Sequence, residues 1–101
     1  MFGVPGGGSS LDLIEAGARE GVDFVLAQTE TGAALMAAVT AELSGAPGVV
    51  LTGVGPGAAS AVNGIAYASL EKSPVVLLTD RQGAGPSLHQ VFDQQALYRP
   101  L

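Results

Sequence analysis

Residues 48–79 read GVVLTGVGPGAASAVNGIAYASLEKSPVVLLT, and this stretch decides the fold class. It opens with the apolar run Gly48–Thr52 and closes with a second run, Pro74–Thr79, neither of which alternates between apolar and polar residues. Continuous apolar runs of this length are typical of strands buried on both faces. The Ala-rich segment Ala58–Leu70 between them has the spacing of a helix. The stretch therefore predicts one strand–helix–strand unit.

The same unit recurs toward the N-terminus. Phe2–Val4 and Asp23–Ala27 are further strand candidates, and Ser10–Glu20 and Thr31–Leu43 are the helices that follow them. A last helix is expected from about Leu88 to Tyr98. Successive units of this kind form a parallel sheet with helices on both faces. We therefore predict a single α/β domain over residues 1–101, with three α/β/α layers and a central parallel sheet.

The predicted helices have recognisable faces and starts. Thr31–Leu43 aligns four large apolar residues on one side, the pattern of an amphipathic helix: Leu35, Met36, Val39 and Leu43. Ser9 and Asp12 have the spacing of a capping pair before the first helix, and Ser87 and Gln90 have capping-box spacing before the last.

The composition indicates a surface that needs partners. Hydrophobic residues make up 48% of the chain and charged residues only 13%, whereas typical domains carry about 25% charged residues. We therefore expect much of the surface to be covered by partners or further domains. The first strand has almost no residues before it, and Arg99, Pro100 and Leu101 end where another strand could begin. We interpret the chain as a truncated domain.

Several classes of function find no support in the sequence. The formal net charge is −5 with four Lys and Arg residues, which argues against nucleic acid binding. No apolar run approaches the roughly 20 residues that a bilayer requires. There is no cysteine and a single histidine, so we expect no disulfide and no metal site in this chain. A reducing, cytoplasmic compartment fits this composition.

In open parallel sheets, ligands bind outside the carboxyl ends of the strands. That rule selects four segments: Pro5–Ser9, Gln28–Gly32, Gly53–Gly57 and Asp80–Gly85. Glu30 and Asp80 are the carboxylates in them. Glu30 also suits a simpler role, because acidic residues in a first helical turn complement the helix dipole.

The other candidate features also have structural explanations. The turn PGGGSS (residues 5–10) could cradle a phosphate at a helix N-terminus or simply join a strand to a helix. Gly55-Pro56-Gly57 fixes a backbone path that serves either a ligand or close packing. We expect Asp80 and Arg81 to form a local ion pair, and His89 to have a surface or packing role.

Three linked segments resemble one family. FGVPGGGSSLDLIEA (2–16), FVLAQTETGAALMAAV (24–39) and the stretch at 48–79 match, in order and spacing, the pyrimidine-binding (PYR) domain of acetolactate-synthase-like enzymes. The resemblance covers about residues 2–80, and SLHQVFDQQALYRPL (87–101) is similar to the segment that follows in that group. The group also includes benzoylformate and pyruvate-type decarboxylases.

The resemblance implies a cofactor and an activating residue. In this family thiamine diphosphate lies between the PYR domain of one subunit and the diphosphate-binding (PP) domain of another. Glu30 matches the glutamate that hydrogen-bonds the aminopyrimidine ring and promotes the imino tautomer that deprotonates the thiazolium. The activated cofactor then attacks a 2-oxo acid and releases carbon dioxide. A carboxyl group in an apolar, partner-covered pocket suits such proton sharing.

The same match implies roles for the turns. Val4, Gly6 and Gly7 would face the substrate. The cofactor-binding set would be Pro5, Glu30, Thr52, Gly53, Gly55, Pro56 and Gly57. The diphosphate and its Mg²⁺ would be held by the PP domain and not by this chain, and the assembly would be a homo-oligomer, either a dimer or a tetramer.

The chain departs from the family in two respects. Many relatives have Arg-His before the glutamate, where this chain has Gln28 and Thr29; this leaves the substrate and reaction type open. The Gly-Asp-Gly…Asn stretch of a PP domain is absent, so the chain is not expected to be active alone. Two alternatives stay open: a non-catalytic scaffold or assembly subunit, and a nucleotide- or flavin-binding module using PGGGSS.

Overall fold

The computed structural model describes residues 1–81, 90 and 92–101, and it contains the strand–helix units expected from the sequence. In chain order the elements are β1 (Phe2–Val4), α1 (Ser10–Arg19), β2 (Val25–Leu26), α2 (Glu30–Ser44), β3 (Gly48–Thr52), α3 (Pro56–Glu71), β4 (Val75–Thr79) and α4 (Gln94–Tyr98). The four strands form one sheet in the order β2-β1-β3-β4. Every neighbouring pair is parallel, which confirms the predicted fold class.

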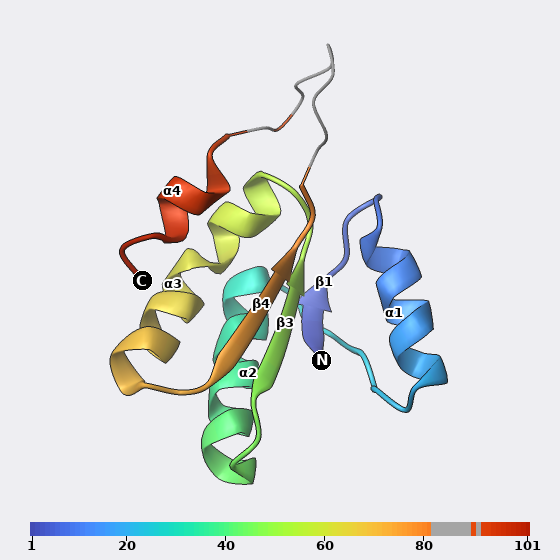
Figure 1. Cartoon of the computed structure of the whole chain (residues 1–101), viewed down its shortest axis with the longest axis horizontal. Coiled ribbons are helices and arrows are strands. Elements are labelled where there is room, and N and C mark those ends of the chain that lie inside the picture. The colour runs from blue at the N-terminus through green and yellow to red at the C-terminus, as the bar shows by residue number, and fades with distance from the viewer. Residues whose placement is uncertain (82–89, 91) are drawn as a thin grey trace.

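The order of the strands separates the helices into two layers. The β1–α1–β2 connection runs across the sheet in the opposite direction to the two connections that follow it. Because such crossovers are right-handed, α1 lies on one side of the sheet and α2 and α3 lie on the other. In Figure 1, α2 and α3 lie to the left of β3 and β4, whereas α1 lies to the right, next to β1. α2 packs against both α3 and β3, whereas α1 packs extensively against none of the strands.

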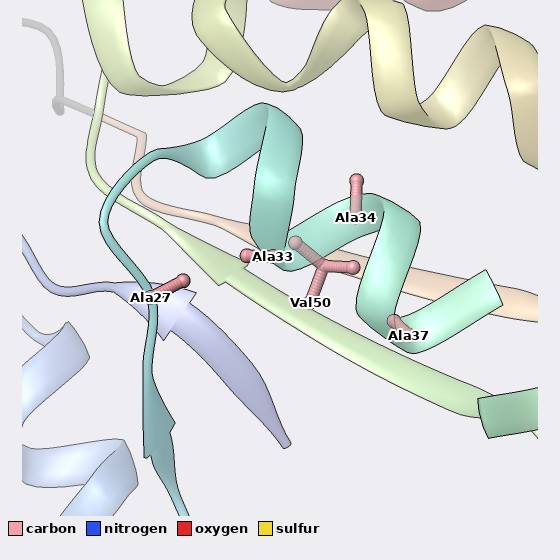
Figure 2. Packing of buried hydrophobic residues seen from close by; sticks show 5 residues of the cluster. All are labelled: Ala27, Ala33, Ala34, Ala37 and Val50. Atoms are coloured by element: carbon pink, nitrogen blue, oxygen red, sulfur yellow. The ribbon is translucent and has the colours of Figure 1, made fainter. Parts of the chain in front are cut away.

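The core is built on the alanines of α2. Ala33, Ala34 and Ala37 are fully buried and pack with Ala27 and Val50, as Figure 2 shows. The large apolar side of the same helix points outward: Leu35, Met36, Val39 and Leu43 are 37%, 38%, 43% and 85% exposed. An amphipathic stripe normally marks the side of a helix that packs in the core. Here that expectation is wrong.

The reason is the close approach of α2 to its neighbours. A Cβ added to Gly48 of β3 would lie 2.1 Å from the Ala37 carbonyl oxygen, and one added to Gly64 of α3 would lie 2.4 Å from Ala34 Cβ. At such spacing only Gly and Ala fit between the backbones. The helix therefore turns its small residues inward and leaves its large ones outside.

The expectation that the strands are buried on both faces holds for only part of the sheet. In β3, Val50, Leu51 and Thr52 are at most 2% exposed. In contrast, Val76 of β4 is 46% exposed, and both β2 residues, Val25 and Leu26, are exposed. The second helix layer consists of α1, which does not reach over β4, so this strand lacks cover on that side (Figure 1). Val25 and Leu26 point to opposite faces, so β2 is exposed on both.

The last helix begins later than predicted. It starts at Gln94, and the Asp93 side chain caps it by accepting a hydrogen bond from the Ala96 amide at 2.9 Å. Gln90 has a positive φ of 64°, a left-handed conformation that interrupts a helix. The expected cap at Ser87 lies outside the described residues.

Candidate functional site

The site lies where the topology opens the sheet. From β1 the chain first moves to β2 on one side and later returns to β3 on the other, so β1 and β3 flank the topological switch point. Crevices at the carboxyl ends of such strands are where α/β sheets bind ligands. A cavity of about 490 Å³ is found there. Its walls are the turn after β1, the first residue of α2, the turn after β3, and the residues at the end of β4 together with Gln90.

Glu30 enters this cavity from the first position of α2. Thr29 is the N-cap: its Oγ1 accepts a hydrogen bond from the Gly32 amide at 3.0 Å, and its carbonyl accepts from the Ala33 amide. Because Thr29 provides the cap, the Glu30 side chain is not needed to start the helix. The half-buried Glu30 carboxylate makes no hydrogen bond or ion pair with any residue that the structure describes.

The floor of the cavity is a contact between two turns. A Cβ on Gly6 would lie 3.1 Å from Gly53 Cα, and one on Gly53 would lie 3.2 Å from Gly6 Cα. The two backbones therefore touch, and neither position accepts a larger residue without displacement. The buried Ser10 hydroxyl donates to the Gly6 carbonyl oxygen at 3.1 Å, which holds the first turn in place.

The start of α3 approaches the glutamate. Pro56 occupies the first helical position, where its fixed φ suits the helix. A Cβ on Gly57 would lie 3.4 Å from Glu30 Oε1 and 3.9 Å from Thr52 Cβ. We call this position the Gly57 hollow. A side chain at position 57 would be in van der Waals contact with both residues, so glycine leaves the space beside Glu30 unfilled.

Asp80 is a second carboxylate that lines the cavity, and two predictions about Asp80 and its partners were wrong. Ser9 does not cap α1 with Asp12; its hydroxyl donates instead to Asp80 Oδ1. Asp80 and Arg81 both line the cavity without forming an ion pair, and the ion pair found in the described part of the chain joins Arg19 to Glu15. The Ser9–Asp80 hydrogen bond links the turn after β1 to the end of β4.

Two glutamines were missed by the sequence analysis. Gln90 lines the cavity. Gln94 accepts a hydrogen bond from the Gly55 amide at 2.8 Å and donates to Thr79 Oγ1 at 3.3 Å, which attaches α4 to the turn after β3. No local pattern marks either residue, because their partners are brought to them only by the fold.

The predicted site residues are mostly brought together. Eight of them line the cavity: Val4, Pro5, Gly6, Gly7, Glu30, Gly53, Pro56 and Gly57. Thr52 and Gly55 do not line it; Thr52 is fully buried beneath the wall, and Gly55 lies against Gln90. His89 is outside the described residues.

In residues 1–81, 90 and 92–101, no group of three or more His, Asp or Glu side chains is arranged to hold a metal ion. Over the same residues, none of the helices has the length and apolar character needed to cross a bilayer.

A parallel sheet with a glutamate in the crevice at its switch point is typical of a ligand-binding α/β domain. Comparison with known proteins identifies the family. Residues 1–97 match the family model described as thiamine pyrophosphate enzyme, N-terminal TPP binding domain, and the chain belongs to this family. It is 36% identical over 105 aligned positions to acetolactate synthase from Bacillus subtilis (strain 168), and 43% identical to the acetolactate synthase large subunit from Lactococcus lactis subsp. lactis (strain IL1403).

Both alignments cover the whole chain but only 18% of the relative. A sulfoacetaldehyde acetyltransferase from Alcaligenes xylosoxydans xylosoxydans is 40% identical over 83 positions, which are 82% of this chain and 14% of that protein. The chain thus spans less than a fifth of the length of these relatives.

Proposed function

We propose that this chain supplies the pyrimidine side of a thiamine diphosphate site in an acetolactate-synthase-like lyase or carboligase, with Glu30 as its catalytic residue. One observation carries the proposal. The Glu30 carboxylate lies in the switch-point crevice, has no partner among the described residues, and borders the open Gly57 hollow. A flat heteroaromatic ring needs such an unobstructed carboxylate beside it, so the residues present fit the pyrimidine end of the cofactor.

In this proposal the chain's own residues have three roles: holding a proton, contacting the ring and bordering the substrate. The Glu30 carboxyl group holds a proton at the ring nitrogen of the aminopyrimidine, a role that requires a carboxyl group within hydrogen-bond reach. Gly53, Pro56 and Gly57 bring backbone close to the ring, and Val4, Gly6 and Gly7 border the substrate side. Thiamine diphosphate itself supplies the electron sink that allows a 2-oxo acid to lose carbon dioxide.

The remaining parts of the site belong to other domains. We propose that a PP domain, on the same or another chain, holds the diphosphate and its Mg²⁺, and that the complete enzyme is a homo-oligomer. The exposed apolar residues of α2 support burial against such a partner, since a monomer rarely exposes so much apolar surface. We also propose a reducing, cytoplasmic compartment, because the sequence contains no cysteine and so does not require an oxidising one.

Calorimetric titration tests this proposal directly. Thiamine diphosphate with Mg²⁺ is titrated into the chain alone and into the chain combined with a PP domain. We expect binding only in the combination, weakened at least tenfold by Glu30→Gln because a hydrogen bond to a charged group is lost. The matched control is Glu71→Gln, which makes the same change at the far end of α3 and should leave the affinity unchanged.

The outcomes separate the alternatives. Tight binding by the chain alone would contradict the shared site and favour a nucleotide- or flavin-type module. If the wild-type combination does not bind, the chain is either a scaffold or a fragment too incomplete to function, and for a scaffold Glu30→Gln will have no effect on assembly.

A further inference from the structure

Thr52, at the carboxyl end of β3, has a hydroxyl group without a partner. The residue is 0% exposed, and its Oγ1 forms no hydrogen bond with any residue that the structure describes. Leaving a buried polar group unpaired is destabilising, and each such group in a native protein calls for an explanation. Its register neighbour Thr79 shows the ordinary situation: that hydroxyl donates to the Gly53 carbonyl oxygen at 3.2 Å and accepts from Gln94.

The position of Thr52 points to Glu30. Side chains alternate along a strand, so Thr52 lies on the same face of β3 as Val50, which packs against α2. Glu30 is the first residue of that helix. The Gly57 hollow lies 3.9 Å from Thr52 Cβ and 3.4 Å from Glu30 Oε1. Thr52 Cβ and the Glu30 carboxylate therefore border the same small space.

A protein partner for Thr52 has to come from within this chain. Because it has no exposed surface, a second chain cannot reach its hydroxyl in this arrangement. Glu30 is free to move toward it, since its carboxylate is held by no described residue and glycine at position 57 adds no side chain to the space that both residues border.

We propose that Thr52 is a positioning residue for Glu30: its hydroxyl donates a hydrogen bond to the Glu30 carboxylate across the Gly57 hollow when that carboxylate engages the aminopyrimidine. This inference rests on the proposed function. Thr52 is buried and does not line the cavity, so its role would be indirect. This differs from the direct cofactor contact that the family resemblance implied. In the unbound chain the unpaired hydroxyl is destabilising, and it becomes a hydrogen-bond donor to the carboxylate when the ligand binds.

The test combines two readouts on Thr52→Val, which has the same shape without the hydroxyl. In the ligand-free chain this variant should raise the unfolding midpoint by about 5 °C, because a buried unpaired group is removed. Thr79→Val is the matched control, and it should lower the midpoint because its hydroxyl has partners. With the PP domain added, Thr52→Val should weaken thiamine diphosphate binding about tenfold, and Thr52→Ser should restore it.

A double-mutant cycle links the effect to Glu30. In the Glu30→Gln background, Thr52→Val should change the dissociation constant less than about twofold, because the two side chains act as a unit. An equal loss of affinity in both backgrounds, or a lowered midpoint like that of Thr79→Val, would overturn the inference. Unchanged binding by Thr52→Val while the wild type binds would sink this inference alone. Absence of binding by the wild type would sink the proposed function and this inference with it.

Discussion

Helix α3 is held by two neighbours in different ways. On one side it packs closely against α2, where a Cβ added to the buried Gly64 of α3 would lie 2.4 Å from the Cβ of the fully buried Ala34 of α2. On the other side α4 buries none of its residues and is attached by polar contacts, such as the hydrogen bond from the Tyr98 hydroxyl to the Ala58 carbonyl oxygen. The first contact belongs to the core, whereas the second joins a short segment to the surface. We expect α4 to open at a lower free energy than α2.

The largest effect should come from filling the close contact. Gly64→Ala would place a Cβ 2.4 Å from Ala34 Cβ and 2.8 Å from the Thr31 carbonyl oxygen. Overpacking costs about 3 kcal/mol, against a gain of about 1 kcal/mol in helix propensity, so the free energy of unfolding should fall by about 2 kcal/mol.

Chemical denaturation measures that change. The control is Asn63→Ala, an exposed neighbour on the same helix, which should be neutral or slightly stabilising. If Gly64→Ala were as stable as the wild type, the α2–α3 contact would be looser than described.

Breaking the polar contact should matter less. Tyr98→Phe removes the hydroxyl that donates to Ala58, which should lower the free energy of unfolding by about 1 kcal/mol. Hydrogen exchange should show faster opening of α4 with α2 and β3 unchanged. Equal acceleration in both regions would mean that α4 belongs to the core after all.

The polar contact should also depend on pH. Burial raises the pKa of Tyr98 above 10.0, so the folded chain keeps the phenolic proton more firmly than the unfolded chain. The stability from this residue is therefore fully present below about pH 10 and is lost as the pH rises through the folded-state pKa. Thermal unfolding between pH 8 and 11 should show this loss in the wild type and a smaller loss in Tyr98→Phe. Identical pH profiles would assign the loss to other groups.

The smallest effect is expected on the outer side of α2. Leu43 is 85% exposed, so Leu43→Gln should change the free energy of unfolding of the chain by less than about 0.5 kcal/mol. The same change should weaken association with a PP domain, if the exposed side of α2 is covered there. A stability loss comparable to Gly64→Ala would show that Leu43 already packs within the chain.

Much of the fold could be predicted from local sequence patterns. The apolar runs at Gly48–Thr52 and Pro74–Thr79, with a helix between them, predict a parallel α/β sheet, and the structure confirms it. Glu30 follows a strand and starts a helix, so its place at the carboxyl edge of the sheet also followed from sequence order. Strand and helix periods depend on neighbouring residues alone, which is why these features were accessible.

Other features were decided only by tertiary structure. The side of α2 that is buried depends on how closely Gly48 and Gly64 let β3 and α3 approach, and hydrophobic periodicity does not contain that distance. Ser9 bonds to Asp80, 71 positions away, rather than to Asp12. Partner choice of this kind depends on which groups the completed fold brings within hydrogen-bond reach, so the sequence by itself determined the elements and their order, and packing in three dimensions determined their partners.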